Sequence, residues 1–162
     1  MITVIVATRE RPTSVMRLLG DVLHQAPSKA EVVVVDQSDA PARERTAAWV
    51  AAQDDDRLRH QIHQPPGLPA ARNAGLASTV GEIVVFFDDD VTLFPGCLAA
   101  HLAAYRDPTV GGVVGRIVEE RLVSNAWRTT NRIGRSGRIH TRLDGPDACF
   151  VETLKGANMS FR

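Results

Sequence analysis

Three consecutive acids, Asp88, Asp89 and Asp90, directly follow the apolar run Ile83–Phe87. A run of this length predicts a buried strand of a parallel sheet, so the acids stand at its carboxyl end, where open α/β sheets bind their ligands. Two carboxylates about 4 Å apart repel each other by about 4 kcal/mol at an effective dielectric constant of about 20, so the triplet favours a counter-ion. These oxygen ligands predict a Mg²⁺ or Mn²⁺ site, and a solvated acidic loop tip is the alternative.

The composition is that of an ordinary globular chain. Its 162 residues are 44% hydrophobic and 23% charged with a net charge of zero, which predicts one domain and no general attraction to nucleic acid. Cys97 and Cys149 lack metal-ligand spacing, so we expect reduced thiols in a cytoplasmic protein, with a disulfide as the alternative. The sequence has no signal-peptide pattern and no apolar stretch of about 18 residues. We therefore expect membrane contact to be peripheral at most.

Apolar runs alternate with helical patterns along most of the chain. Strands are predicted over Ile2–Ala7, Val32–Val35, Arg57–His63, Ile83–Phe87, Val110–Val118 and Cys149–Leu154. Helices are predicted over Pro12–His24, Ala42–Ala52, Leu68–Ser78 and from Phe94 to Tyr105. This alternation predicts an α/β fold with a Rossmann-like, mostly parallel sheet flanked by helices.

The pattern dissolves over residues 119–147. Arginines recur there without an acid between Arg121 and Asp144, and glycines interrupt them. We expect a long Arg-rich loop, because segments of this kind are usually solvated or act as lids. The functional alternative is that this segment holds an anionic group, such as a lipid phosphate or an acidic glycan.

Three strand ends should meet in one cleft, since the carboxyl ends of neighbouring parallel strands share one edge of the sheet. Thr8 follows the first strand, Asp36 the second, and the acid triplet the fourth. Asp36 could accept a hydrogen bond from a nucleotide base, although, taken alone, an Asx turn or helix N-cap explains it better. If the fourth strand stays extended through the acids, Asp88 and Asp90 point to one face and Asp89 to the other.

Arg72 stands near the start of the Ala-rich helix predicted over Leu68–Ser78. There its guanidinium could fork onto phosphate oxygens, and the helix start adds backbone N–H groups that favour an anion. A surface ion pair is the alternative for this residue.

Successive segments resemble blocks of the family 2 glycosyltransferases, which have the GT-A fold. These segments are Val4–Pro12, Val34–Ser38, Gly67–Gly75, Phe86–Val91 and Lys155–Arg162. The resemblance implies transfer of a sugar, with inversion, from a UDP- or GDP-linked nucleoside diphosphate donor. The acceptor would be an unknown glycan, lipid or small molecule.

The resemblance also implies roles for the acids. Its DxD-type motif falls on Asp88 and Asp90, with Asp90 the main ligand of Mn²⁺ or Mg²⁺ and Asp88 or Asp89 near the ribose. Asp36 falls on the position that recognises the base. These roles agree with the hypothesis drawn from the residues themselves.

The remaining roles fall on three residues outside the triplet. Thr8 corresponds to the first nucleotide loop and Arg72 to the contact with the diphosphate. The family usually has Thr-Tyr-Asn where this chain has Thr8-Arg9-Glu10, so Arg9 would stack on the base in place of an aromatic ring.

The family's catalytic base lies downstream of the Gly-Ala-Asn block, and hence is expected beyond residue 162. We therefore expect residues 1–162 to be the nucleotide-sugar-binding portion of one GT-A domain, incomplete at its C-terminus. The acceptor-side half with the base would be absent, so the chain should bind donor but transfer little sugar alone.

Three alternative functions remain open at this stage. A phospho-receiver domain needs an acidic pair directly after the first strand, where this chain has Ala7-Thr8. A nucleotidyltransferase needs a Gly-rich phosphate loop there, and Thr8–Pro12 contains no glycine. A non-catalytic nucleotide-sugar-binding module fits the same residues as the enzyme does.

Overall fold

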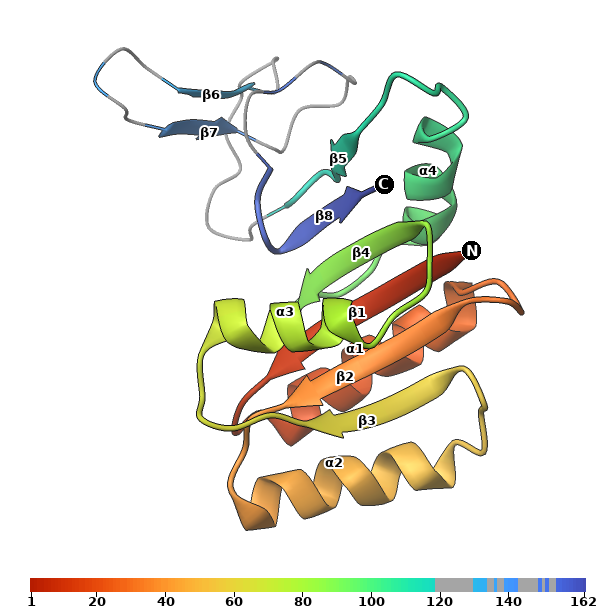
Figure 1. Cartoon of the computed structure of the whole chain (residues 1–162), viewed down its shortest axis with the longest axis vertical. Coiled ribbons are helices and arrows are strands. Elements are labelled where there is room, and N and C mark those ends of the chain that lie inside the picture. Colours follow the sequence, from red (N-terminus) through yellow and green to blue (C-terminus); the bar gives the residue numbers. More distant parts are fainter. Residues whose placement is uncertain (119–129, 134–135, 137–138, 143–148, 150, 152–153) are drawn as a thin grey trace.

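The computed structural model describes residues 1–118, 130–133, 136, 139–142, 149, 151 and 154–162. Its main feature is a six-stranded sheet with the strand order β3-β2-β1-β4-β8-β5 (Figure 1). The strands are β1 Ile2–Thr8, β2 Glu31–Asp36, β3 Leu58–Ile62, β4 Ile83–Asp88, β5 Gly112–Val114 and β8 Asn158–Phe161. β1 to β4 run parallel, and β8 is antiparallel to both of its neighbours. The predicted α/β class and mostly parallel sheet are confirmed.

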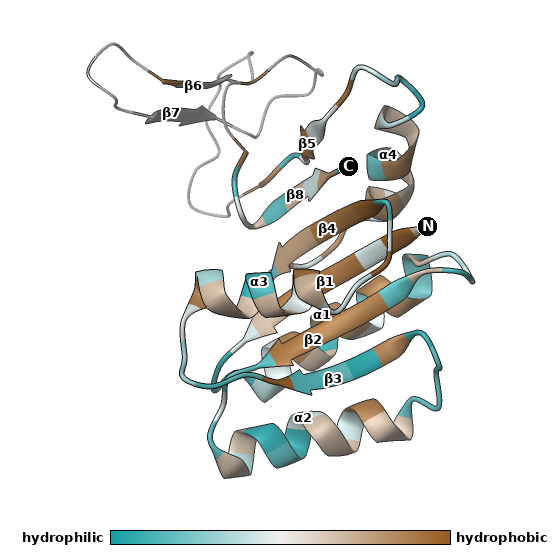
Figure 2. Cartoon of the chain, viewed as in Figure 1, coloured by the Kyte–Doolittle hydropathy of each residue, from teal (hydrophilic) through white to brown (hydrophobic). Residues whose placement is uncertain are grey.

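Helices cover both faces of the sheet, as Figure 1 shows. They are α1 Pro12–Gln25, α2 Ala40–Ala52, α3 Leu68–Ala77 and α4 Cys97–Ala104. α1, α2 and α4 pack on the larger core, and α3 packs on the opposite face through Ala71 and Gly75. Because both faces are covered, the central strands are apolar at nearly every position, as Figure 2 shows in brown.

Side chains of each central strand alternate between the two cores. In β1, Val4 and Val6 join the core under α1, whereas Ile5 and Ala7 join the core under α3. Gly75 allows α3 to approach β1 closely, since a Cβ at this position would lie 2.7 Å from Cγ2 of Ile5. This packing fixes the height of α3 above the sheet, and with it the position of Arg72.

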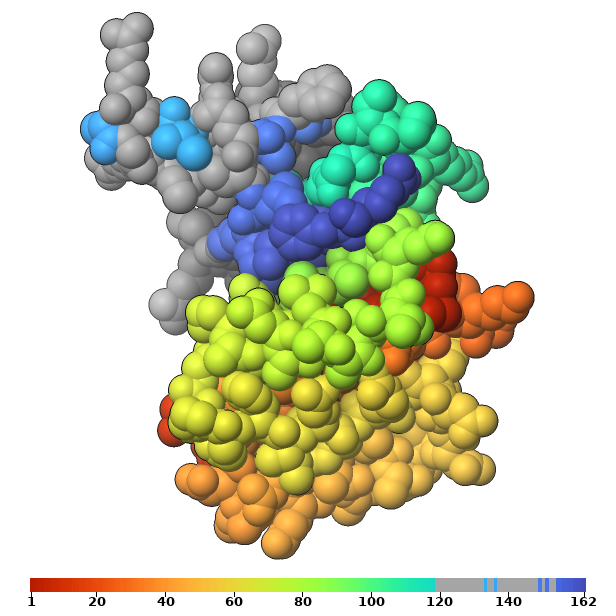
Figure 3. All heavy atoms as spheres, viewed as in Figure 1, coloured from red at the N-terminus to blue at the C-terminus, as the bar shows by residue number. Residues whose placement is uncertain are grey.

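The C-terminal part of the sheet differs from the prediction. Cys149–Leu154 was expected to be a strand, but its described residues, Cys149, Val151 and Leu154, lie outside any strand. The strand is instead β8, whose Asn158 pairs with Phe87 of β4. The two strands lie side by side in Figure 3 although they are far apart in the sequence. β8 is short and partly polar, so its pairing with β4 and β5, not an apolar pattern, defines it.

Two further predictions need correction. The strand expected over Val110–Val118 is only Gly112–Val114, because β8 offers β5 just three paired positions. Within the segment expected to be an Arg-rich loop, Thr130–Ile133 (β6) and Ile139–Arg142 (β7) form a two-stranded antiparallel sheet. Backbone hydrogen bonds hold such a hairpin, so its strands need no apolar period. No helix in the described ranges is long and apolar enough to cross a membrane.

Candidate functional site

The site lies where the order of the strands reverses. From β1 the chain proceeds to β2 and β3 on one side of the sheet, and β4 pairs with β1 on the other side. At the carboxyl end of β1, Thr8 pairs with Asp36 and the preceding Ala7 pairs with Asp88. The predicted convergence of Thr8, Asp36 and the acid triplet is therefore confirmed, at the type of position where open α/β sheets bind ligands.

Asp89 is held from two sides. The hydroxyl of Thr8 donates to Asp89 Oδ2 at 2.7 Å, and both side chains are almost fully buried. Arg11 Nη1 donates to Asp89 Oδ1 at 3.1 Å and, with the same nitrogen, to Asp90 Oδ2 at 3.0 Å. The charge of Asp89, together with that of Asp90, raises the pKa of Arg11 above its ordinary value. Arg11 is thus the counter-ion of two of the three acids.

Asp88 has a different partner. Arg72 Nη2 donates to Asp88 Oδ1 at 2.8 Å and to the backbone carbonyl of Gly156 at 3.2 Å. The guanidinium carbon also lies 5.7 Å from the centre of the Phe86 ring. Burial raises the pKa of Asp88, the positive charge of Arg72 opposes that rise, and the charges of Asp90 and Asp89 add to it. Arg72 therefore lies at this edge of the sheet, and the ion pair considered above as the alternative is present.

The predicted orientation of the acids required an extended strand through all three, and the structure does not meet this condition. Asp88 faces α3 through Arg72 and Asp89 faces the opposite side through Thr8, as strand alternation requires. Asp90, however, shares Arg11 with Asp89 instead of joining Asp88. The reason is that β4 ends at Asp88 and the chain turns over the next two residues, so alternation no longer applies.

Asp36 is fully buried beneath the cleft. Its Oδ1 accepts the backbone N–H of Ser38 at 2.8 Å, which forms the Asx turn considered above as the alternative. Its Oδ2 lies 3.0 Å from Nε2 of His60 on β3. Burial alone would raise the pKa of Asp36, but the hydrogen bonds from His60 and Ser38 outweigh it, so the pKa is lowered. A role in base recognition stays a prediction.

Arg9 and Gln37 lie at the same edge of the sheet. Arg9 has a predicted role in the site, whereas Gln37 has none. Arg9 is exposed and, among the described residues, its side chain forms no hydrogen bond or ion pair. The side-chain Oε1 of Gln37 accepts a hydrogen bond from the backbone N–H of Gly67 at 2.5 Å. The backbone N–H of Gln37 donates to the carbonyl of Thr8 at 3.0 Å. Gln37 therefore connects the end of β1 with the start of α3. A buried glutamine after an apolar strand is the signal that could have indicated it.

The acids fit a hard divalent cation in part. Within the described ranges, Asp88 and Asp90 each keep one carboxylate oxygen without a hydrogen-bond partner, and both side chains are 39% or more exposed. Oxygen donors of this kind suit Mg²⁺ and Mn²⁺. In the described part of the chain, no three or more His, Cys, Asp or Glu side chains are arranged so that they alone could hold a metal ion. Further ligands, such as a diphosphate and water, would have to complete the coordination.

Comparisons with known proteins agree with this geometry. The family model described as glycosyl transferase family 2 matches residues 3–160. The pre-mycofactocin glycosyltransferase of Mycobacterium tuberculosis is 34% identical over 143 residues, which are 88% of this chain and 28% of that protein. The chain thus spans less than a third of that relative's length.

Solved structures show the same fold. The mannosyltransferase PcManGT from Pyrobaculum calidifontis, in complex with GDP-Man and Mn²⁺, superposes with a TM-score of 0.73 at 26% identity, covering 99% of this chain and 44% of that one. S. aureus TarS 1-349 has a TM-score of 0.70 at 20% identity, covering 99% of this chain and 46% of that one. The architecture is therefore that of the GT-A glycosyltransferases, and the chain belongs to glycosyl transferase family 2.

Proposed function

We propose that this chain binds the nucleoside diphosphate sugar of an inverting glycosyltransferase, with a UDP- or GDP-linked donor. One observation carries the proposal: the acid triplet ends β4 beside Thr8 at the switch point, and Arg72 approaches it from α3. Membership of glycosyl transferase family 2 supports it. Phospho-receiver domains and nucleotidyltransferases, two alternatives from the sequence, do not belong to this family.

Asp90 and Asp88 would hold the cation, Mn²⁺ or Mg²⁺, through their free carboxylate oxygens. The bound ion supplies a positive charge that stabilises the departing nucleoside diphosphate. Asp88 or Asp89 would lie near the ribose, and Asp89 is fixed by its hydrogen bond with Thr8. Support for the cation comes from the donor set, and PcManGT, at 26% identity, contains Mn²⁺ together with GDP-Man.

Arg72 would bind the diphosphate. Its side chain is only 19% exposed, and the contacts with Asp88, Gly156 and Phe86 hold it in one place. Among the described residues, only Nη2 of this side chain makes hydrogen bonds, so within this part of the chain its other N–H groups remain for phosphate oxygens. A fixed cation stabilises negative charge as the leaving group departs, without rearranging during the reaction.

Arg9 and Asp36 would recognise the base. Arg9 is exposed at the edge of the cleft, where its planar guanidinium can stack on a base. Asp36 would have to use the remaining lone pairs of its buried carboxylate. Four further points stay predictions. They are a catalytic base beyond residue 162, weak transfer by this chain alone, an acceptor that is a glycan, lipid or small molecule, and a cytoplasmic location.

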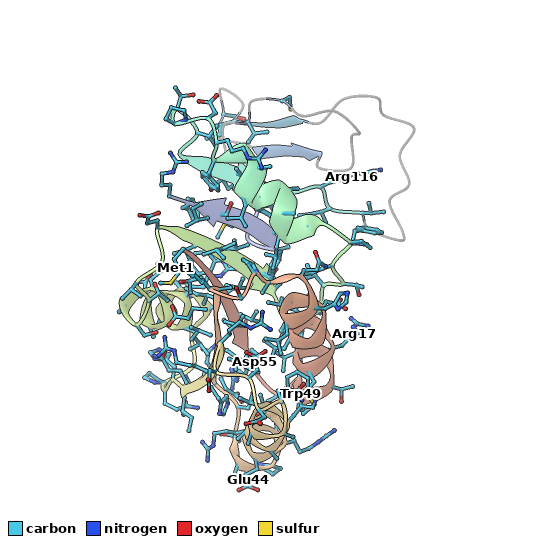
Figure 4. The ribbon with its side chains drawn as sticks, turned by 90° about the vertical axis from the view of Figure 1, so that its right-hand side faces the viewer. Met1, Arg17, Glu44, Trp49, Asp55 and Arg116 are labelled. Carbon is cyan, nitrogen blue, oxygen red and sulfur yellow. The ribbon has the colours of Figure 1, made fainter. Side chains whose placement is uncertain are left out.

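Isothermal titration calorimetry with GDP, UDP, GDP-mannose and UDP-GlcNAc, each with and without Mn²⁺, tests the proposal. We expect at least one of them to bind more tightly with Mn²⁺, and Asp90→Ala to abolish that difference. Glu44→Ala is the matched control, because Glu44 is an exposed acid on α2 (Figure 4) that takes part in none of the contacts described for the triplet. Failure of all four to bind with or without Mn²⁺ would exclude the proposal.

A further inference from the structure

Arg11 lies between two of the three acids, Asp89 and Asp90. A single nitrogen, Nη1, lies 3.1 Å from an oxygen of Asp89 and 3.0 Å from an oxygen of Asp90. The other oxygen of Asp89 is already bound to Thr8, so within the described chain both oxygens of Asp89 are used. The positive charge thus sits between two carboxylates, in the manner of a bridging cation.

The side chain of Arg11 is nevertheless free to leave. It is 55% exposed, and among the described residues its guanidinium makes hydrogen bonds only to these two acids. Arg72 on the other side of the triplet is 19% exposed and has additional contacts with Gly156 and Phe86. The two arginines therefore differ: Arg72 is a fixed element of the cleft and Arg11 a movable one.

The backbone position of Arg11 favours an anion in place of a cation. Arg11 is the N-cap of the 14-residue helix α1, and in the described chain no side chain caps that end and its first turn holds no acid. A helix N-terminus carries a partial positive charge, so a guanidinium there is unfavourable unless acids offset it. If another cation took the acids, Arg11 and the helix start would together present a site for a phosphate.

We propose that Arg11 is an internal counter-cation that a divalent metal held by Asp88 and Asp90 must displace, because the two positive charges would otherwise share Asp90, and that the displaced guanidinium then pairs with the donor diphosphate. Metal and nucleotide binding are thereby coupled. The metal replaces Arg11 at the acids, and the diphosphate replaces the acids as the partner of Arg11. This inference rests on the proposed function for its diphosphate, but its effect on metal binding can be measured with no nucleotide present.

Binding of Mn²⁺ alone, followed by electron paramagnetic resonance, tests the displacement. Arg11→Gln should bind Mn²⁺ about tenfold or more tightly than the wild type, because a competing positive charge is lost next to the acids. Arg17→Gln removes an exposed positive charge from the same helix (Figure 4) and should leave the affinity within about twofold of the wild type, because exposed charges act weakly at a distance. Arg11→Lys, which keeps the charge, should stay closer to the wild type than Arg11→Gln.

Two further measurements separate the possible failures. In the wild type, GDP or UDP should tighten Mn²⁺ binding, and Arg11→Gln should show a smaller fold-change on adding the same nucleotide. Mn²⁺ should also raise the melting temperature of Arg11→Gln more than that of the wild type. Equal or weaker Mn²⁺ binding by Arg11→Gln would overturn the inference, even if the wild type binds nucleotides. A gain in Mn²⁺ affinity without any nucleotide binding would uphold the displacement and overturn the diphosphate partner and the proposed function.

Discussion

The hydroxyl of Thr8, the last residue of β1, donates a 2.7 Å hydrogen bond to Oδ2 of Asp89 just beyond β4. Both residues are nearly inaccessible to solvent, with exposed fractions of 2% and 7%. The bond joins the ends of two adjacent strands on either side of the switch point. The hydrogen bond therefore fixes the orientation of Asp89, the middle acid of the triplet, relative to the end of β1.

Thr8→Val keeps the shape of the side chain but removes this donor. Because Asp89 stays buried with an oxygen that loses its partner, we expect unfolding free energy to fall by about 1–3 kcal/mol in urea denaturation. Thr13→Val is the matched control on exposed surface, where, among the described residues, the Thr13 hydroxyl only accepts a 3.5 Å hydrogen bond from Arg45, and it should change stability by less than about 0.5 kcal/mol. Equal stability of the two variants would contradict this role for Thr8.

Gly156→Ala should displace Arg72 from Asp88. A Cβ at residue 156 would lie 2.8 Å from both terminal nitrogens of Arg72, and this flexible side chain can move away. On the proposed function, we expect nucleoside diphosphate affinity to fall about tenfold while stability changes by less than about 1 kcal/mol, measured by calorimetry and urea denaturation. At Gly111 a Cβ would meet no described atom within 4 Å, so Gly111→Ala should retain the affinity. Unchanged binding by Gly156→Ala would mean that the position of Arg72 does not matter.

Gly75→Ala should destabilise the packing of α3. The new Cβ would lie 2.7 Å from Ile5 and 3.2 Å from Val35, both fully buried in the sheet, so the helix must shift. We expect a loss of about 1–3 kcal/mol in unfolding free energy. In the exposed interior of α1, Gly20→Ala meets no described atom within 4 Å and should gain up to about 1 kcal/mol from helix propensity. A neutral or stabilising effect of Gly75→Ala would show that α3 is not closely packed.

Stability should fall as pH drops below about 6.5, the ordinary pKa of histidine. His101 is buried on α4 between Ser160 and Asn158 of β8, at 2.7 Å from each, and burial lowers its pKa although the hydrogen bond with Asn158 opposes this. The unfolded chain therefore binds the proton more readily, and stability declines between pH 6.5 and the lower pKa of the folded state. Urea denaturation from pH 5 to 7.5 measures this slope.

His101→Gln should flatten that slope, since it removes the titrating ring, and should lower stability at pH 7.5. His24→Gln, a substitution of an exposed histidine on α1, should keep the slope of the wild type. If His101→Gln retains the full slope, another group is responsible. The pKa of Asp36 is also lowered, but its protonation affects stability only below about pH 4, outside the measured range.

The order of β1 to β4 and their helices could be predicted from the sequence because the signals are local. Continuous apolar runs bounded by breaks mark strands that are buried on both faces, and β1, β2 and β4 were located to within a residue or two. Once those strands are parallel, topology alone places Thr8, Asp36 and Asp88 at one edge.

The partners of the acids could not be predicted in this way. Arg11 and the acids it binds are 78 and 79 positions apart, and the pairing depends on where β4 ends and how the chain turns after it. β8 could not be predicted for a related reason, because its four residues become a strand only through backbone pairing with β4 and β5. Residue types and local periods thus determined which elements form and which acids reach the cleft. Only the tertiary structure decided which cation each acid contacts, since hydrogen bonds and ion pairs act over a few ångströms in space and leave no periodic pattern in the chain.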